Sequence, residues 1–154
     1  MAVSNLAIFP QLPFSASAVA TAANTTLSDA TDANIVELVL PTDVESDGCQ
    51  IVAAVALPRA TCTATVLYLY LSTDNGTTRR LVAVASAVAD TVSATDAPAE
   101  VAFKFKGSTI SESNPLYIPP GSGSAKARLY FGASVALSAG WVAHVQGLRL
   151  TKAA

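Results

Sequence analysis

Few side chains in this sequence are of the types that perform chemistry, and an acidic stretch is the most suggestive group. Asp43, Glu45 and Asp47 alternate with other residues and are followed by Gly48, which imitates the opening of a calcium-binding EF-hand loop. Such a loop requires a glutamate at its twelfth position, where this chain has Ala54, and a helix on each side. We therefore interpret the stretch as a solvated acidic turn and predict no metal ion and no cofactor.

The residues of catalytic type are similarly isolated. His144 is the only histidine, and a Ser-His-Asp relay built on it would lack the Gly-x-Ser-x-Gly motif that often presents the nucleophile. A zinc site requires a cluster of histidines and cysteines that the sequence does not contain. The glycine-rich residues 121–124 lack the Gly-Lys-Ser/Thr ending of a phosphate-binding loop. We predict that His144 is structural, that there is no catalytic residue, and that the protein is not an enzyme.

Two cysteines raise the question of a disulfide. If the strand that starts at Cys49 turns back at residues 58–60 into the next strand, Cys49 faces Leu69, which is about seven residues from Cys62. At about 3.3 Å per residue the two thiols are then roughly 20 Å apart, whereas a disulfide requires Cα atoms within about 7 Å. This register predicts two buried free thiols.

The aromatic residues offer a third chemistry, the binding of sugars. A platform of exposed rings could stack on a glycan. On strands, however, such residues are more simply explained as core or interface aromatics. The candidates are Tyr68, Tyr70, Tyr117, Tyr130 and Trp141.

These residues must be positioned by strands, and the clearest strand signal lies in residues 61–87. Two apolar sets alternate here, Val66, Tyr68 and Tyr70 with the leucines between them, which is typical of a strand buried on both faces. A turn follows at residues 72–76, where Asn-Gly tolerates positive φ, and a second β-rich run covers residues 80–87. We predict a long central hairpin; the alternative is a helix over residues 81–92, where alanine is common.

Further strands are expected at regular spacing along the chain. Val101, Phe103 and Phe105 should point inward, and Trp141, Ala143 and Val145 should share one face. The proline-bounded segment 115–120 can only be an edge strand. The other strands are expected at residues 34–40, 50–57, 127–137 and 141–150. About eight strands with proline and glycine punctuation predict an all-β fold, an antiparallel β-sandwich of jelly-roll-like type.

The first 28 residues contain no charged side chain and no clean periodicity. Because Pro10 and Pro13 interrupt the segment, we interpret residues 1–31 as an extended arm and residues 32–154 as the sandwich domain. The arm would bind a partner through four apolar anchors, Ile8, Phe9, Leu12 and Phe14. The alternative is that the segment forms a first strand packed on its own domain.

Charged residues make up only 13% of the chain, about half the usual share of roughly 25%. We infer that much of the surface contacts other protein, as in an obligate oligomer; the alternative is a soluble surface rich in Ser and Thr. A net charge of −2 predicts no nucleic-acid partner. No apolar run is long enough for a membrane helix and no basic secretory segment is visible, so we expect no membrane partner and synthesis in a cytoplasm.

The charges are also unevenly distributed. Six acids and no base precede Arg59, and four bases and no acid occur from Lys126 onward. This asymmetry could pair the two ends within one fold, or join the acidic part of one subunit to the basic part of the next.

One resemblance points to a function. The segment PLYIPPGSG…ARLYFGASVALSAGWVAHVQG, residues 115–147, resembles the C-terminal part of small structural proteins of tailed-bacteriophage virions, with weaker support from TRRLVAVASAVADT. The resemblance covers mainly the last third of the chain, and the segment GSGSAK departs from its pattern. It implies a particle component. Among such components the best match is to capsid decoration proteins, which are small β-rich domains with an extended arm and are often trimeric.

The resemblance therefore implies a cement protein that binds the head lattice through the major capsid protein or another virion protein and assembles as a homotrimer. Its location would be the virion, assembled in the host cytoplasm. The alternatives are a tail, baseplate or head–tail connector component, or a module on the particle that binds host glycans. The low charge and the uncharged first 28 residues favour decoration.

Overall fold

The computed structural model describes residues 8–27, 34–41, 48–120 and 125–152, and within them the side chains from Leu12 to Leu150. This part of the chain contains strands and no helix. The strands are β1 (Ile8–Ala20), β2 (Val36–Leu38), β3 (Cys49–Pro58), β4 (Thr65–Ser72), β5 (Arg80–Ala87), β6 (Val101–Ala102), β7 (Lys104–Phe105), β8 (Ser108–Thr109), β9 (Leu116–Ile118), β10 (Arg128–Ala133) and β11 (Trp141–Lys152).

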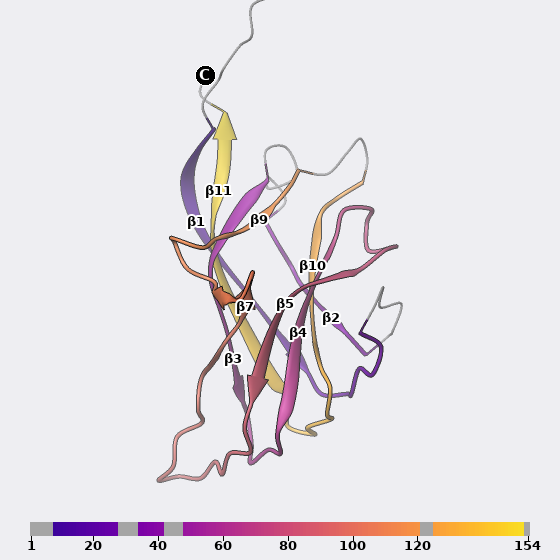
Figure 1. Cartoon of the computed structure of the whole chain (residues 1–154), viewed down its shortest axis with the longest axis vertical. Helices are drawn as coiled ribbons and strands as arrows, with labels where there is room; N and C mark the ends of the chain where they lie inside the picture. Colours follow the sequence, from indigo (N-terminus) through magenta and orange to yellow (C-terminus); the bar gives the residue numbers. More distant parts are fainter. Residues whose placement is uncertain (1–7, 28–33, 42–47, 121–124, 153–154) are drawn as a thin grey trace, which may run out of the picture.

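The strands form two antiparallel sheets that pack face to face (Figure 1). The five-stranded sheet has the order β1-β11-β3-β6, with β9 also paired to β3, and the six-stranded sheet has the order β2-β10-β4-β5-β7-β8. Eight of these strands pair as a nested series, β1 with β11, β2 with β10, β3 with β9 and β4 with β5. Successive pairs alternate between the sheets, which is the jelly-roll arrangement. The predicted β-sandwich is confirmed.

The central hairpin of the sequence is the innermost pair of this series. β4 and β5 pair from Thr65↔Ala87 to Leu71↔Arg80, and four consecutive residues of β4, Leu67 to Tyr70, are buried, as expected for a strand covered on both faces. Asn75 and Gly76 have φ of 62° and 85° in the connecting turn. A side chain at Gly76 would collide with the Tyr130 hydroxyl. The alternative of a helix after residue 80 is excluded.

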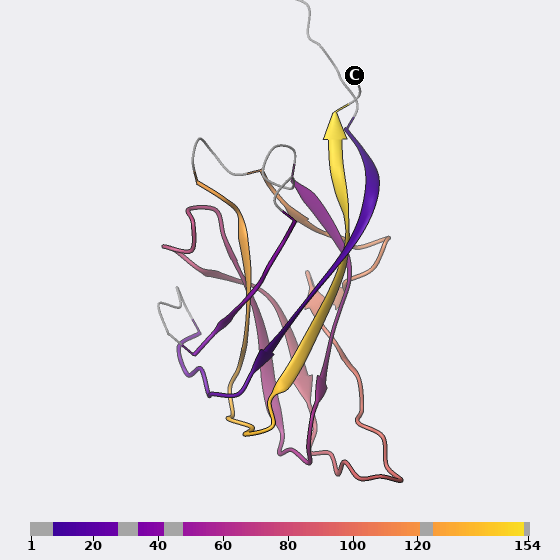
Figure 2. The same ribbon diagram turned by 180° about the vertical axis from the view of Figure 1, so that it is seen from behind.

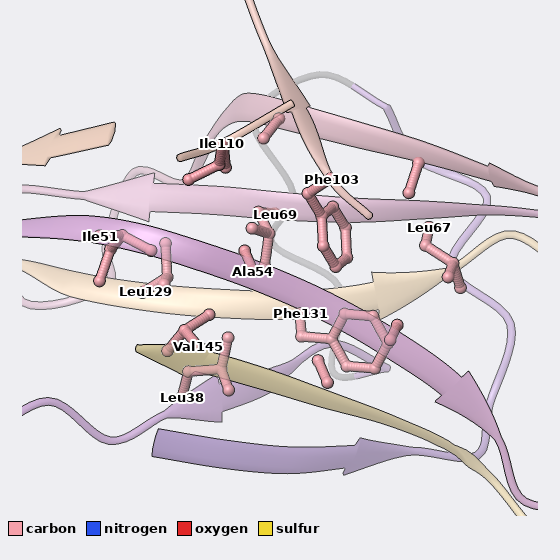
Figure 3. Close-up of a cluster of buried hydrophobic side chains, with 14 of the residues drawn as sticks. Leu38, Ile51, Ala54, Leu67, Leu69, Phe103, Ile110, Leu129, Phe131 and Val145 are labelled. Carbon is pink, nitrogen blue, oxygen red and sulfur yellow. The ribbon is translucent and has the colours of Figure 1, made fainter. Parts of the chain in front are cut away.

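The core lies between the two sheets (Figure 3). Phe103 is fully buried there and contacts Phe131 edge to face, with ring centroids 6.2 Å apart. Its main chain marks the point where one strand passes between the sheets: β6 pairs with β3, whereas β7 pairs with β5. The inward faces predicted for residues 101–105 and 141–145 are confirmed, with Trp141, Ala143 and Val145 all buried.

The predicted register between the third and fourth strands is wrong. β3 and β4 follow each other in the chain but belong to different sheets, because residues 59–64 carry the chain across the sandwich instead of turning back. Cys49 pairs with Ile118 and Arg149, and Cys62 forms an isolated bridge with Asp90. Both cysteines are nevertheless buried and free. The two predicted thiols are therefore present, although the register from which they were predicted is wrong.

The interpretation of the N-terminal segment as an arm is corrected for Ile8–Ala20. These residues form β1, which pairs with β11 from Ile8↔Lys152 to Ala20↔Trp141 (Figure 2), so the second alternative, a first strand of the domain itself, describes them. Pro10 and Pro13 do not prevent pairing because β1 is the terminal strand of its sheet, where a missing N–H can face away from the neighbour. The register shift between the two prolines accommodates them.

Candidate interaction surface

The outer face of the five-stranded sheet carries no charged side chain over its centre. Because side chains alternate along a strand, the residues between the buried positions of β1, β11 and β3 point away from the core and form rows across the sheet. We call this surface the open face. The rows are Val19–Val142–Leu57, Ser17–His144–Val55–Ala102 and Ser15–Gln146–Ala53.

Each of these ten side chains is exposed or half-buried. None is Asp, Glu, Lys or Arg, although charged residues normally make up a large part of a soluble surface. Among the described residues, no further strand or loop forms backbone hydrogen bonds across the open face. The surface is therefore mostly small or apolar, and accessible.

His144 lies in the middle row, between Ser17 on β1 and Val55 on β3. Its side chain is exposed, and no hydrogen bond or ion pair joins it to another described residue. The hydroxyl of Ser17 is a cross-strand neighbour, but the rows contain no carboxylate that could complete a relay. The geometry presents His144 as the single titratable group of an otherwise neutral surface.

The four proposed anchors of the arm are not equivalent. Ile8 and Phe9 lie in β1 opposite Lys152 and Thr151, and their side chains fall outside the described residues. Leu12 is 54% exposed, between the two prolines of the register shift. Phe14 is half-buried and packs against the core of its own domain, so of the two described anchors only Leu12 presents a large apolar surface to a partner.

Phe14 explains a break in the regularity of β11. It pairs with Gly147, where an added Cβ would lie 2.5 Å from the Phe14 ring and 2.7 Å from the carbonyl oxygen of Gln50. Glycine is required because the ring lies directly over the backbone. Beside this contact is a groove of about 450 Å³, lined by Pro13, Phe14, Ser15, Val52, Gln146, Gly147 and Leu148.

Over strands β2, β10 and β4, the outer face of the six-stranded sheet is covered instead by the chain itself. Tyr68, Tyr70 and Tyr130 form a buried cluster with Ile35, which we call the tyrosine cluster. The fully buried Asn24 donates hydrogen bonds to the Tyr70 hydroxyl, at 2.8 Å, and to the Thr26 carbonyl, at 3.2 Å. Residues 23–26 are thereby fixed against β10, where the backbone N–H of Asn24 donates to the Ala133 carbonyl.

These contacts bear on the idea of a sugar-binding platform. Four of the five aromatic candidates are buried, Trp141 in the main core and three tyrosines in the tyrosine cluster, while Tyr117 is 47% exposed on β9. They therefore lie on different surfaces and form no common platform. Their interpretation as core aromatics is confirmed for all but Tyr117.

Charged side chains gather at the end of the six-stranded sheet. Arg128 on β10 forms an ion pair of 2.9 Å with Glu37 on β2, and the Glu37 carboxylate raises the pKa of Arg128. The Arg79 guanidinium lies 4.5 Å from the centroid of the Tyr130 ring. The Glu37–Arg128 pair joins the acidic and basic parts of the sequence within one fold, which was the first of the two alternatives.

The remaining candidate chemistry is limited. Burial raises the pKa of the Cys49 thiol to about 12, so this cysteine is not a reactive nucleophile near neutral pH. Asp43, Glu45 and Asp47 fall outside the described residues. In the part of the chain that the structure describes, no three potential metal ligands lie together, and no helix has the length and apolar character needed to cross a membrane.

Comparisons with known proteins return no match to a family model, to a curated protein or to a solved structure. The open face itself was missed at the level of the sequence. Its signal is present, however, because residues 15–19, 53–57 and 142–146 are strand segments without a charge on either face.

Proposed function

We propose that the protein is a non-enzymatic structural component of a bacteriophage particle, a capsid decoration protein that binds and stabilises the head lattice. The observation that carries this proposal is the open face, a sheet surface without Asp, Glu, Lys or Arg that no described part of the chain covers. A lattice protein with a matching apolar surface would bury it without having to desolvate charges. The resemblance of residues 115–147 to virion structural proteins supports the same assignment.

The proposed partners are the major capsid protein or another virion protein, and further copies of the chain. A shortage of surface charge supports a homo-oligomer, and the resemblance implies a trimer. Repeated attachment over a lattice makes a weak individual contact sufficient, because neighbouring contacts raise the effective concentration of each other.

The number of copies per particle distinguishes decoration from the alternatives. On a stained gel of purified particles we expect on the order of hundreds of copies, since one oligomer attaches at each of many equivalent sites. A connector or baseplate component would be present in roughly six to twelve copies, as expected for a ring. That smaller number would overturn the proposal.

A binding measurement tests the surface. We expect Gln146→Lys, which places a charge on the open face at an exposed position, to reduce occupancy on particles that lack the native protein at least tenfold. Ala97→Lys, in an exposed loop, adds the same charge elsewhere and should keep full occupancy. Equal binding by both variants would remove the open face from the proposal.

A further inference from the structure

The free edge of β1 is the second unsatisfied surface of the five-stranded sheet. β1 pairs with β11 on one side, and no described strand pairs with its other side. An edge strand presents a row of backbone N–H and C=O groups that a further strand can bind. The backbone groups of this edge can therefore bind a segment of chain in extended conformation.

Natural proteins usually protect such an edge with charges, prolines or bulges. In β1 those devices are confined to its first half, where Pro10, Pro13 and the register shift lie. Residues 14–20, with the sequence FSASAVA, contain no proline and no charge and pair regularly with β11. Seven consecutive residues thus form an unprotected edge, which we call the β1 edge.

The β1 edge is complementary to itself. If two copies pair antiparallel about Ser17, then Ser17 faces Ser17, Ala16 faces Ala18, Ser15 faces Val19 and Phe14 faces Ala20. Every pair contains at least one small side chain, and no two bulky or like-charged groups meet. This is also the register in which all seven residues pair while Pro13 and Thr21 remain outside.

The surroundings favour the same partner. β1 lies against β2, the terminal strand of the other sheet, so this side of the sandwich combines both sheet ends. The large apolar side chains of Leu12 on β1 and of Val39 just after β2 are exposed. The Glu37 carboxylate on β2 is already paired with Arg128, so two copies can approach here without bringing unpaired carboxylates of this strand together.

We infer that two copies of the protein associate through their β1 edges, about a two-fold axis at Ser17, to form one continuous ten-stranded sheet. The open faces of both copies then lie on the same side of that sheet. The inference does not depend on the proposed role in a particle. A two-fold contact cannot close a trimer, so it predicts an even number of copies, a dimer or two trimers joined as a hexamer.

Engineered disulfides test this register in the full-length protein. Opposed residues of antiparallel strands have Cα atoms about 4.5–5.5 Å apart, within the range that a disulfide requires. Ser17→Cys should therefore form a covalent dimer under mild oxidation. Ser15→Cys is the matched control, on the same strand and face, because the two copies of residue 15 would be roughly 13 Å apart and should not cross-link.

Mixing provides a second control. Ser15→Cys should cross-link to Val19→Cys when the two variants are combined, because those positions are opposed in the inferred register. The wild type should remain uncross-linked, since its two cysteines are buried. Equal cross-linking by all single variants would indicate random collision, and none at all would exclude the pairing; either result overturns the inference.

A charge variant tests the contact without covalent chemistry. Ser17 is exposed, so Ser17→Lys should fold normally, yet it places two ammonium groups opposite each other at the two-fold axis. We expect its dimer dissociation constant in sedimentation to rise at least tenfold, while Ala97→Lys leaves it unchanged. A wild type that is a monomer or a simple trimer would refute the proposal.

Discussion

Over strands β2, β10 and β4, residues of the same chain cover the outer face of the six-stranded sheet, whereas no described residue covers the outer face of the five-stranded sheet. The tyrosine cluster is buried beneath Asn24 and its hydrogen bonds, while the open face consists of accessible, uncharged side chains. The covered region carries the Glu37–Arg128 ion pair and the Arg79 guanidinium against Tyr130, whereas the rows of the open face contain no Asp, Glu, Lys or Arg. Among the described residues, the chain's own contacts thus cover one of these faces and leave the other exposed.

The two faces should contribute differently to the stability of the isolated protein. Residues on the covered face contribute to the free energy of unfolding of the isolated protein, since their contacts exist before any partner binds. Residues on the open face contribute little to it, because they remain solvated. A substitution on the covered face should therefore lower the free energy of unfolding, whereas one on the open face should leave it nearly unchanged. Four expected effects on stability are given next, from the largest to the smallest.

Deletion of residues 2–20 should abolish the cooperative thermal unfolding transition in circular dichroism. It removes β1 and so exposes one edge of β11, the strand that carries the buried side chains of Trp141 and Val145. Deletion of residues 2–7 alone keeps all of β1 and should retain the transition. A folded product of the longer deletion would show that β1 is dispensable and would restore the arm interpretation.

Gly147→Ala should destabilise the protein by about 1–3 kcal/mol, as overpacking does. The new Cβ would meet both the Phe14 ring and the backbone carbonyl of Gln50. Chemical denaturation measures the change. The double variant Phe14→Leu, Gly147→Ala should recover part of the loss by removing the ring but not the carbonyl; an unchanged stability of the single variant would contradict the packing of β1 on β11.

Tyr70→Phe should cost about 1–2 kcal/mol, because it removes the hydroxyl that Asn24 donates to and that itself donates to the Thr26 carbonyl. His144→Ala, at an exposed position of the open face, should change the unfolding free energy by less than about 0.5 kcal/mol. Equal effects in denaturant titrations would erase the distinction between the faces.

The smallest effect is expected at the central turn. The Thr78 amide and the Ser72 hydroxyl donate to the Asp74 carboxylate and lower its pKa from 3.8 to about 2. Because the pKa of Asp74 is lower in the folded state than in the unfolded state, its ionised carboxylate stabilises the fold. This stabilisation is fully present above about pH 4 and is lost as the pH falls toward 2. Asp74→Asn should therefore lower the melting temperature slightly at pH 6, with a difference that shrinks at pH 2–3. A difference that grows on acidification would contradict the sign of the pKa shift.

The sequence by itself determined the fold class and, outside residues 8–20, most of the local elements. Alternation in residues 66–71, the Asn75-Gly76 turn and the proline-bounded segment 115–120 specify strands, a hairpin and an edge, because side-chain period and backbone φ are local properties. The inward faces of residues 101–105 and 141–145 followed from the same period. The low charge also pointed to a surface that meets other protein, which remains a prediction.

Only the tertiary structure decided which strands are neighbours. Residues 59–64 read equally well as a hairpin turn or as a crossing between sheets, and β3 and β4 proved to lie in different sheets. Pro10 and Pro13 suggested an arm, yet a terminal strand tolerates them, and β11 accepts β1 along its length. The open face depends on rows contributed by residues about 130 positions apart, such as Ser17 and His144. No local pattern encodes such a contact, because it results from the pairing of distant strands around a shared core.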